Sequence, residues 1–337
     1  MKNVTIVDVA NKAGVSPATV THALNGKRPV NDATRVRIIQ AIKELGYVPN
    51  FNASRLRSGR SGIIGCYATD ITESFANRLV RGLQCALSGN DSSLLFTSGV
   101  ELGGSVSRAI KLFRSYNVDG ILLCSHIMMN SSTMDELAAS GIPAVSVNSE
   151  IEGIPSIIPD NYAGGMQAAD HLVASGCTHP SLVTGPEKRE VVTQRGKGYV
   201  ERLGELNIDV SGSLIQEGDY TFSSGYEKTK LILSSHPEVD GVFCSNDYMA
   251  AGAITACGEL GRRVPEDVLV LGFDNREFSA FWPTPISTFQ PPLEQMGQLG
   301  MQMLLGLIQN SDSPGTAETI KMPATLIIRK STSRSRN

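Results

Sequence analysis

The sequence lacks the segments that carry a chain into or across a membrane. It has no uninterrupted run of about 18 apolar residues, and no charged N-terminal segment followed by an apolar stretch. Neither a membrane span nor a signal peptide is predicted, so we expect a cytoplasmic protein with no membrane partner. A secreted solute-binding protein would need an export signal, and this class is therefore disfavoured.

The cysteines lack the spacing of a metal site or a disulfide framework. They are scattered, several lie within apolar runs, and neither a Cys-x-x-Cys motif nor a nearby pair of histidines accompanies them. Cysteines of this kind are usually buried, reduced thiols. We therefore expect no metal, no cofactor and no disulfide at Cys66, Cys85, Cys124, Cys177, Cys244 or Cys257.

The short motifs of several enzyme classes are also missing. The sequence contains no G-x-x-x-x-G-K-[ST], no G-x-G-x-x-G, no G-x-S-x-G and no H-E-x-x-H motif, and its five histidines form no recognisable constellation. Nothing marks phosphate transfer, nucleotide binding or nucleophilic catalysis. We expect a protein that is not an enzyme, and turnover of a ligand would favour the alternative.

What the sequence does have is a strong separation of charge. Residues 1–60 contain ten Lys or Arg and three Asp or Glu, and because the net charge is −3 the remainder carries an excess of ten negative charges. A cationic terminus suggests a polyanionic partner, since basic groups near phosphates release condensed counterions. A solvated basic face would also explain the charge. At 337 residues, the chain is long enough for two or three folding units.

Three short helices are predicted in the basic segment. The first begins at Thr5, which forms a capping-box variant with Asp8, and ends near Gly14. The second spans about 16–25 with Ser16 as its N-cap. The third begins at Asn31 or Asp32, ends at Gly46, and is expected to place Val36, Ile39, Ile42 and Leu45 inward.

The second of these helices has two distinct sides. An apolar stripe should face the core, and the opposite side should point away from it. Two short helices joined by a tight turn containing glycine match the helix-turn-helix geometry that fits a DNA major groove. The stripe comprises Val20, Ala23 and Leu24, and the outward side comprises Pro17, Ala18, Thr21 and His22.

After residue 61, apolar strand-like runs alternate with amphipathic helical runs. This alternation is typical of parallel α/β architecture, and two doubly wound subdomains are the natural interpretation. Strands are expected at 63–68, 93–97, 120–125, 144–148, 181–185, 214–217, 241–245 and 268–274, then at 286–290 and 325–329. Helices are expected around 75–87, 163–174, 193–206, 249–260 and 293–309.

Many of these features occur together in one known family. The sequence resembles the lactose-repressor (LacI) family, and the likeness covers nearly the whole chain. It is carried by Val4-Thr5-Ile6, Asp8-Val9-Ala10, Ala13-Gly14-Val15-Ser16, Ala18-Thr19-Val20, Leu24-Asn25-Gly26, Arg35-Val36, Ala41, Leu45-Gly46-Tyr47, Pro49-Asn50 and Ala53-Ser54-Arg55-Leu56.

The resemblance implies an all-α helix-turn-helix headpiece at 1–49, a hinge helix or linker at 50–60, and an α/β sensor at 61–330. The sensor should have two periplasmic-binding-protein-like subdomains, the first from about 61–159 and 290–320, the second from about 160–289 and 321–330. The polar, basic end at 331–337 is expected to be disordered.

The resemblance also implies which headpiece residues bind double-stranded DNA. Pro17, Ala18 and His22 match positions that touch base edges, where the first two offer apolar contacts and His22 a hydrogen bond. Family members commonly have Ser and Arg where this chain has Thr21 and His22, so the operator sequence is not implied. Thr5, Ser16, Thr19, Asn25 and Arg35 are placed for phosphates.

The segment 50–58 resembles the family's hinge helix, which orders on DNA. Leu56 matches a leucine that wedges into a central minor-groove step, and Arg55 and Arg57 can hold the phosphates. Without the resemblance, Leu56 would be a stray exposed apolar residue. Asn50 and Ala53 complete the expected hinge contacts.

By the same resemblance, a small-molecule effector binds between the sensor subdomains, where the carboxyl ends of parallel strands meet. Asn246 and Asp247 follow the strand at 241–245. Arg195, in an Arg-x-x-Gly-Tyr pattern, resembles a ligand-binding arginine, and Asp274 resembles a hydroxyl-binding acid. Weaker candidates are Phe75, Asp160, Arg189, Tyr220 and Phe222. The aromatic residues among them would cover a sugar face, but each could equally be plain packing.

The effector is expected to be a sugar or sugar derivative. Arg189 together with Arg195 would suit an anionic effector, because guanidinium groups grip carboxylates and phosphates. In the neutral alternative, Arg195 bonds sugar hydroxyls and Arg189 is solvated. We expect a homodimer on a pseudo-palindromic operator, since no additional heptad-patterned helix is present to tether tetramers.

Overall fold

The chain divides into two compact units, Met1–Ser61 and Gly62–Asn337. In the part that our computed structural model describes, no helix is long and apolar enough to cross a membrane. The described residues are 4–25, 29–47, 60–69, 74–99, 105–124, 127, 129–186, 190–310 and 317–334.

The first unit contains, within its described residues, the three helices α1 (Ile6–Ala13), α2 (Pro17–Asn25) and α3 (Asp32–Leu45). Thr5 caps α1 as predicted: its backbone N donates to the Asp8 carboxylate at 2.8 Å, and the Asp8 backbone N donates to the Thr5 hydroxyl at 3.4 Å. Such reciprocal bonds satisfy donors that an α-helix leaves unpaired at its start.

The core of this unit corrects part of the predicted packing. Val9, Val20 and Ile38 are fully buried, whereas Val36 is 65% exposed and Ile39 is 47% exposed. The predicted stripe on α3 used a constant spacing of three, which drifts around a helix by about 60° at each step. The stripe that packs has mixed spacings of three and four: Ile38, Ala41, Ile42 and Leu45.

A second correction concerns α2. Val20 is buried and Ala23 packs against the same core, but Leu24 is 40% exposed. The inward prediction for Leu24 is therefore wrong, because the narrow contact of a two-turn helix with its neighbours covers Val20 and Ala23 only.

The second unit contains two sheets, each with six strands among the described residues. The first is parallel throughout and has the order β11-β5-β4-β3-β1-β2; the second has the order β12-β10-β9-β8-β6-β7, with β12 antiparallel to β10. The strands are β1 (Ile63–Ala68), β2 (Ser93–Ser98), β3 (Gly120–Leu123), β4 (Ala144–Val147), β5 (Ser156–Pro159), β6 (Pro180–Thr184), β7 (Ile215–Glu217), β8 (Gly241–Cys244), β9 (Leu269–Phe273), β10 (Ser287–Gln290), β11 (Thr319–Met322) and β12 (Thr325–Ile327).

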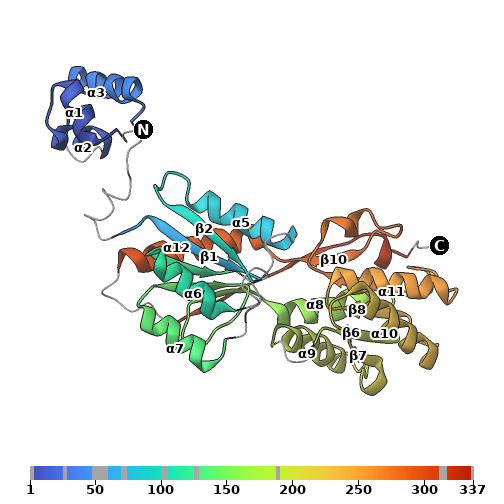
Figure 1. Cartoon of the computed structure of the whole chain (residues 1–337). Helices are drawn as coiled ribbons and strands as arrows, with labels where there is room; N and C mark the ends of the chain where they lie inside the picture. Colours follow the sequence, from blue (N-terminus) through green and yellow to red (C-terminus); the bar gives the residue numbers. More distant parts are fainter. Residues whose placement is uncertain are drawn as a thin grey trace. The chain divides into compact units, whose positions relative to one another are not determined.

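Helices cover both faces of each sheet (Figure 1). On β6, Leu182 packs with Tyr199 of one helix layer, while its neighbour Val183 packs with Met249 of the other, so alternate residues serve opposite faces. The helices of the first sheet are α5 (Ser74–Ala86), α6 (Val106–Ser115), α7 (Ser131–Ser140) and α12 (Leu293–Gln309). Those of the second are α8 (Asn161–Ala174), α9 (Glu190–Glu205), α10 (Phe222–Ser235) and α11 (Asp247–Glu259).

The ten strands expected from the sequence are all present, and two further strands were not predicted. β5 is a four-residue segment ending in proline, and β11 is a four-residue edge strand containing Lys321. β5 offers two apolar residues between Ser156 and Pro159, and β11 alternates apolar with polar residues, so neither has a long apolar run.

The predicted disorder from residue 331 onward is wrong for residues 331–334. Ser331 is fully buried; its hydroxyl donates to the Val270 carbonyl at 2.6 Å and accepts from the Ser287 backbone N at 2.8 Å. The polar segment finds hydrogen-bond partners on β9 and β10, and polarity therefore did not mean exposure. Residues 335–337 lie outside the described part.

Candidate functional site

The expected base-reading residues occupy the start of α2. Pro17 and Ala18 are exposed, and Thr21 and His22 are partly exposed. The Thr21 hydroxyl donates to the Pro17 carbonyl at 3.0 Å, which leaves its methyl group as the outward contact. The first turn of α2 can thus offer mainly apolar contacts, with His22 as the polar group one turn later.

The residues expected at phosphates are also at the surface. Ser16 is exposed and caps α2, because its hydroxyl accepts from the Thr19 backbone N at 3.2 Å. Thr5 has the same capping role on α1, and Arg35 is exposed on α3. The side chain of Asn25 lies outside the described residues, as do Asn50, Ala53, Arg55, Leu56 and Arg57.

In the second unit, Arg195 is a buried cation on α9, only 6% exposed. Its Nε and Nη2 atoms donate to Oδ1 of Asn161 at 3.2 and 2.7 Å, and Nη1 donates to the Ser245 carbonyl. Its guanidinium carbon lies 3.4 Å from the centre of the Phe273 ring, a cation–π contact. Burial lowers the pKa of Arg195, and the nearby Asp274 carboxylate opposes this shift.

Two glycines bring Arg195 to Asn161. A Cβ atom at Gly165 of α8 would collide with the backbone carbonyl of Arg195, and one at Gly198 of α9 would collide with that of Tyr162. Without side chains at the crossing, the two helices pack backbone to backbone. Asn161, the first residue of α8, therefore reaches the guanidinium group.

Asp247 is a fully buried carboxyl at the start of α11. Its Oδ2 accepts from the Arg276 backbone N at 2.7 Å, and its Oδ1 accepts from the Thr288 hydroxyl at 2.5 Å. Burial, and after it the charge of Asp274, raises the pKa of Asp247 to about 7, against the opposing effect of these hydrogen bonds. A carboxyl at 247 can therefore exchange a proton near neutral pH.

Asp274 follows β9 with an uncommon backbone conformation. Its φ is 101°, and that of the next residue, Asn275, is 47°. Positive φ values cost energy in residues with a side chain, and they persist where the surroundings fix them, often at functional sites. The Asp274 carboxylate lies 3.9 Å from Nε of Arg276.

Asn246 and Tyr220 are joined beyond the ends of β8 and β7, the two strands that flank β6. Asn246 caps α11 by accepting from the Met249 backbone N at 2.9 Å, and its side-chain amide donates to the Tyr220 carbonyl at 3.0 Å. Tyr220 has a φ of 70°, and its ring fills the space where a side chain at residue 185 would lie, which requires Gly185. The ring is thereby fixed beside the end of β6.

The weaker candidates do not form one group. Asp160 is the N-cap of α8 and accepts from the Ala163 backbone N at 3.0 Å, a role that explains this residue by itself. Phe222 is 37% exposed, and its ring lies 5.8 Å from that of Trp282. Arg189 and the side chain of Phe75 lie outside the described residues.

Sequence reasoning missed several residues that the structure places around Arg195, Asp247 and Asp274. Asn161 could have been found, because it directly follows Asp160 at the end of a strand, but that strand was itself not predicted. Arg78, Arg276 and Thr288 carry no local signal, since their importance arises from partners far away in the sequence.

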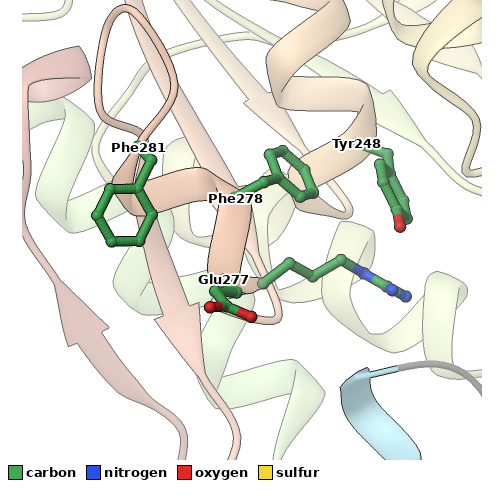
Figure 2. Close-up of a pocket in the computed structure, with 5 residues that line it drawn as sticks. Tyr248, Glu277, Phe278 and Phe281 are labelled. Atoms are coloured by element: carbon green, nitrogen blue, oxygen red, sulfur yellow. The ribbon is translucent and has the colours of Figure 1, made fainter.

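An aromatic surface cavity lies next to Arg276. Its volume is about 410 Å³, and in the view of Figure 2 Phe278 stands between Tyr248 and Phe281. The Tyr248 and Phe278 rings stack with their centres 5.0 Å apart, and the Arg276 guanidinium carbon lies 4.5 Å from the centre of Tyr248. Phe281 is 82% exposed.

The cysteines are all free thiols, with Cys85 exposed and the other five buried. Within the described ranges, no group of three or more His, Cys, Asp or Glu residues could hold a metal ion.

Two family patterns match the chain. One, described as bacterial regulatory proteins of the lacI family, matches residues 5–50; the other, a periplasmic binding protein-like domain, matches residues 169–332. The ribose operon repressor of Bacillus subtilis (strain 168) is 32% identical over 97% of this chain and 98% of its own length. The probable HTH-type transcriptional repressor ExuR of the same organism is 31% identical over 98% of this chain and 99% of its own length.

A solved structure agrees with these relatives. The lac repressor dimer bound to operator and the anti-inducer ONPF superposes with a TM-score of 0.84, at 28% identity, over 98% of this chain and 99% of the repressor chain. A helix-turn-helix unit followed by a two-sheet α/β unit of the periplasmic-binding kind defines a class, the transcription regulators that carry a ligand-binding domain. Within that class, the chain belongs to the LacI family.

Proposed function

We propose that the chain is a transcriptional repressor that binds operator DNA through its first unit and responds to a small molecule bound in its second. The observation that carries this proposal is the joining of a helix-turn-helix unit to a two-sheet α/β unit with polar side chains gathered at its strand ends. Relatives matched along almost their whole length, including HTH-type transcriptional repressor CytR of Escherichia coli (strain K12) at 30% identity, are repressors by name.

On the DNA side, α2 is the element that enters the major groove. Exposure of Pro17 and Ala18 at its first turn supports apolar contacts to base edges, with His22 adding a hydrogen bond. Phosphate contacts from Thr5, Ser16, Thr19, Asn25 and Arg35 would fix the register, and Thr21 lies on the same outward side of α2 as the base-reading residues. The hinge residues Asn50, Ala53, Arg55 and Arg57, with Leu56 as the wedge in the minor groove, stay a prediction.

On the effector side, the ligand would be a sugar or sugar derivative. Asn246, Asp247 and Asp274 lie at or just beyond the carboxyl ends of β8 and β9, where parallel sheets generally bind ligands, and carboxyl and amide groups suit hydroxyls. Among related structures, the transcriptional regulator CelR was solved with cellobiose, at 29% identity and a TM-score of 0.71 over 98% of this chain.

The proposed regulator acts as a homodimer on a pseudo-palindromic operator. Two headpieces related by a two-fold axis would read two half-sites, as in the lac repressor dimer bound to operator. Coupling between the sites is reciprocal, so an effector that weakens DNA binding must itself bind the DNA complex more weakly. The role is regulatory rather than catalytic, and it places the chain in the cytoplasm with the DNA.

The proposal is tested by measuring ligand binding and DNA binding on the same protein. Sugars and sugar derivatives that raise the melting temperature are identified first, and each is then added to a titration of the full chain with a DNA site recovered from a random pool. A ligand that stabilises the chain should change the DNA affinity at least about fivefold.

Two variants locate the effect. Asp274→Ala should keep its DNA affinity and lose the response to the ligand, whereas Asp135→Ala, which removes an exposed carboxylate on α7, should keep both. An undiminished response in Asp274→Ala would remove this residue from the site. A ligand that stabilises the chain but leaves DNA affinity unchanged would contradict the proposed regulation.

A further inference from the structure

Arg78 connects the two sheets of the sensor unit across a separation of 196 residues. It lies on α5, which covers the first sheet, and its Nη2 atom donates to the backbone carbonyl of Asp274 at 2.8 Å, just after β9 of the second sheet. The side chain is partly buried. A guanidinium group carries five N–H donors, so this bond leaves four of them for another acceptor.

Arg78 shares its surroundings with charges of both signs. Burial lowers the pKa of Arg78, Asp274 and Asp247 oppose that shift, and the second cation Arg276 adds to it. Burial next to another cation is costly unless an anion compensates.

The other charged groups of this cluster are largely committed to partners. Arg195 is held by Asn161 and Ser245, and Arg276 lies near the Asp274 carboxylate. Among the residues that the structure describes, three arginines therefore face two carboxyls, and Asp247 is only partly ionised near neutral pH. When Asp247 is ionised the excess among these five groups is one positive charge, and Arg78, like Arg195, donates to a neutral acceptor rather than to a carboxylate.

Building on the proposed effector site, we propose that Arg78 binds an anionic group of the effector and that the effector is a hydroxylated carboxylic acid, such as a sugar acid. A carboxylate has the two acceptor oxygens that match the fork of a guanidinium group. A single negative charge, as a carboxylate supplies, balances the excess that remains when Asp247 is ionised. The nearby amide and carboxyl groups would then receive the hydroxyls.

The experiment compares three kinds of probe on the full-length protein. Gluconate, glucuronate and galacturonate supply a carboxylate, glucose and galactose are neutral, and glucose 6-phosphate supplies a phosphate. Binding is measured by thermal shift and calorimetry for the wild type, Arg78→Gln and Arg78→Lys. Arg81→Gln is the matched control, because Arg81 lies on the same helix with its side chain 71% exposed.

We expect at least one of the acids to stabilise the wild type and the neutral sugars to bind at least tenfold more weakly. Arg78→Gln should weaken binding of that acid tenfold or more, Arg78→Lys should retain part of the affinity by its charge, and Arg81→Gln should bind as the wild type does. The melting temperatures without ligand establish that the variants are folded.

Three results would overturn the inference: stabilisation by a neutral sugar or by the phosphate but by no acid, equal binding of the acid to the wild type and Arg78→Gln, or no stabilisation by any acid of the panel. The proposed function would survive these results if the chain still selects a DNA site and a neutral sugar or the phosphate alters its affinity. Failure to select any DNA site would instead remove the proposed function itself.

Discussion

Asn161 and Arg195 share a forked hydrogen bond, in which two nitrogens of the guanidinium group, Nε and Nη2, donate to the single Oδ1 atom of the amide at 3.2 and 2.7 Å. Both residues are buried, and each is supplied by one of two helices that cross through glycines. The pair therefore fixes a positive charge close to Asp274 and Asp247, whose carboxyls define the polar end of the second sheet.

Replacing Asn161 by alanine should destabilise the sensor unit. The change leaves buried N–H groups of Arg195 without an acceptor, which costs about 1–3 kcal/mol and more for charged groups. Asn161→Asp, which keeps an acceptor at the same position, should lose less. Urea unfolding of the full chain measures the difference, and equal stability of the alanine variant and the wild type would show that the forked bond contributes nothing.

Asp247 should make the stability of the protein depend on pH. Its pKa is about 7 in the folded state against 3.8 for an ordinary aspartate, so between these values the folded state keeps a proton that the unfolded chain releases. The free energy of unfolding therefore falls as the pH rises from about 4 to about 7, by on the order of a few kcal/mol. Above about pH 7, Asp247 is ionised in the folded state as well, and the loss of folding free energy is complete.

The neutral variant Asp247→Asn should lack this dependence. Its free energy of unfolding relative to the wild type should increase between pH 5 and pH 8, while the exposed-site control Asp135→Asn should show no such change. A constant difference between Asp247→Asn and the wild type over this range would mean that Asp247 is not the titrating group.

Two adjacent isoleucines on α3 provide a matched test of the headpiece core. Ile38 is fully buried, and its replacement by alanine should cost about 2–5 kcal/mol, enough to unfold a unit of this size and abolish DNA binding. Ile39 is 47% exposed, and the same replacement should change stability by less than about 0.5–1 kcal/mol. Circular dichroism melting of both variants decides the matter. Similar losses of stability in the two variants would contradict the finding that Ile38, and not Ile39, faces the core.

Thiol labelling should count one reactive cysteine in the native protein. Cys85 is exposed, whereas the other five are buried, and burial raises the pKa of Cys124 and of Cys257 to about 12. Because the thiolate is the reactive form, these groups should react only after unfolding. Ellman's reagent should report one thiol in buffer and six in denaturant, and Cys85→Ser should remove the fast phase. More than one fast thiol would contradict the packing.

Local signals explain why so much of the architecture could be predicted. The capping residues Thr5 and Ser16 fixed two helix starts, and buried parallel strands are apolar on both faces, which makes runs such as 63–68 visible in the sequence. It is harder to predict which side of a short helix faces the core. The sequence of α3 allows several apolar stripes, and only its contacts with α1 and α2 place Ile38 rather than Ile39 in the core.

The charged site around Asp247 and Asp274 could be predicted only in part. Asp247 and Asp274 could be proposed because they follow recognisable strands, yet the charge around them depends on Arg78, which comes from a helix of the other sheet. Ser331 was expected to be disordered, since no local property reveals that its hydroxyl reaches Val270. Partners distant in sequence therefore set the limits of prediction here.

The central claim is that the first unit reads a DNA sequence. Selection from a pool of random duplexes by the full-length protein, at physiological salt, tests it most directly. The account predicts enrichment of a pseudo-palindromic site, bound on the order of a thousandfold or more tighter than unselected DNA. Equal retention of all duplexes after repeated rounds would contradict it.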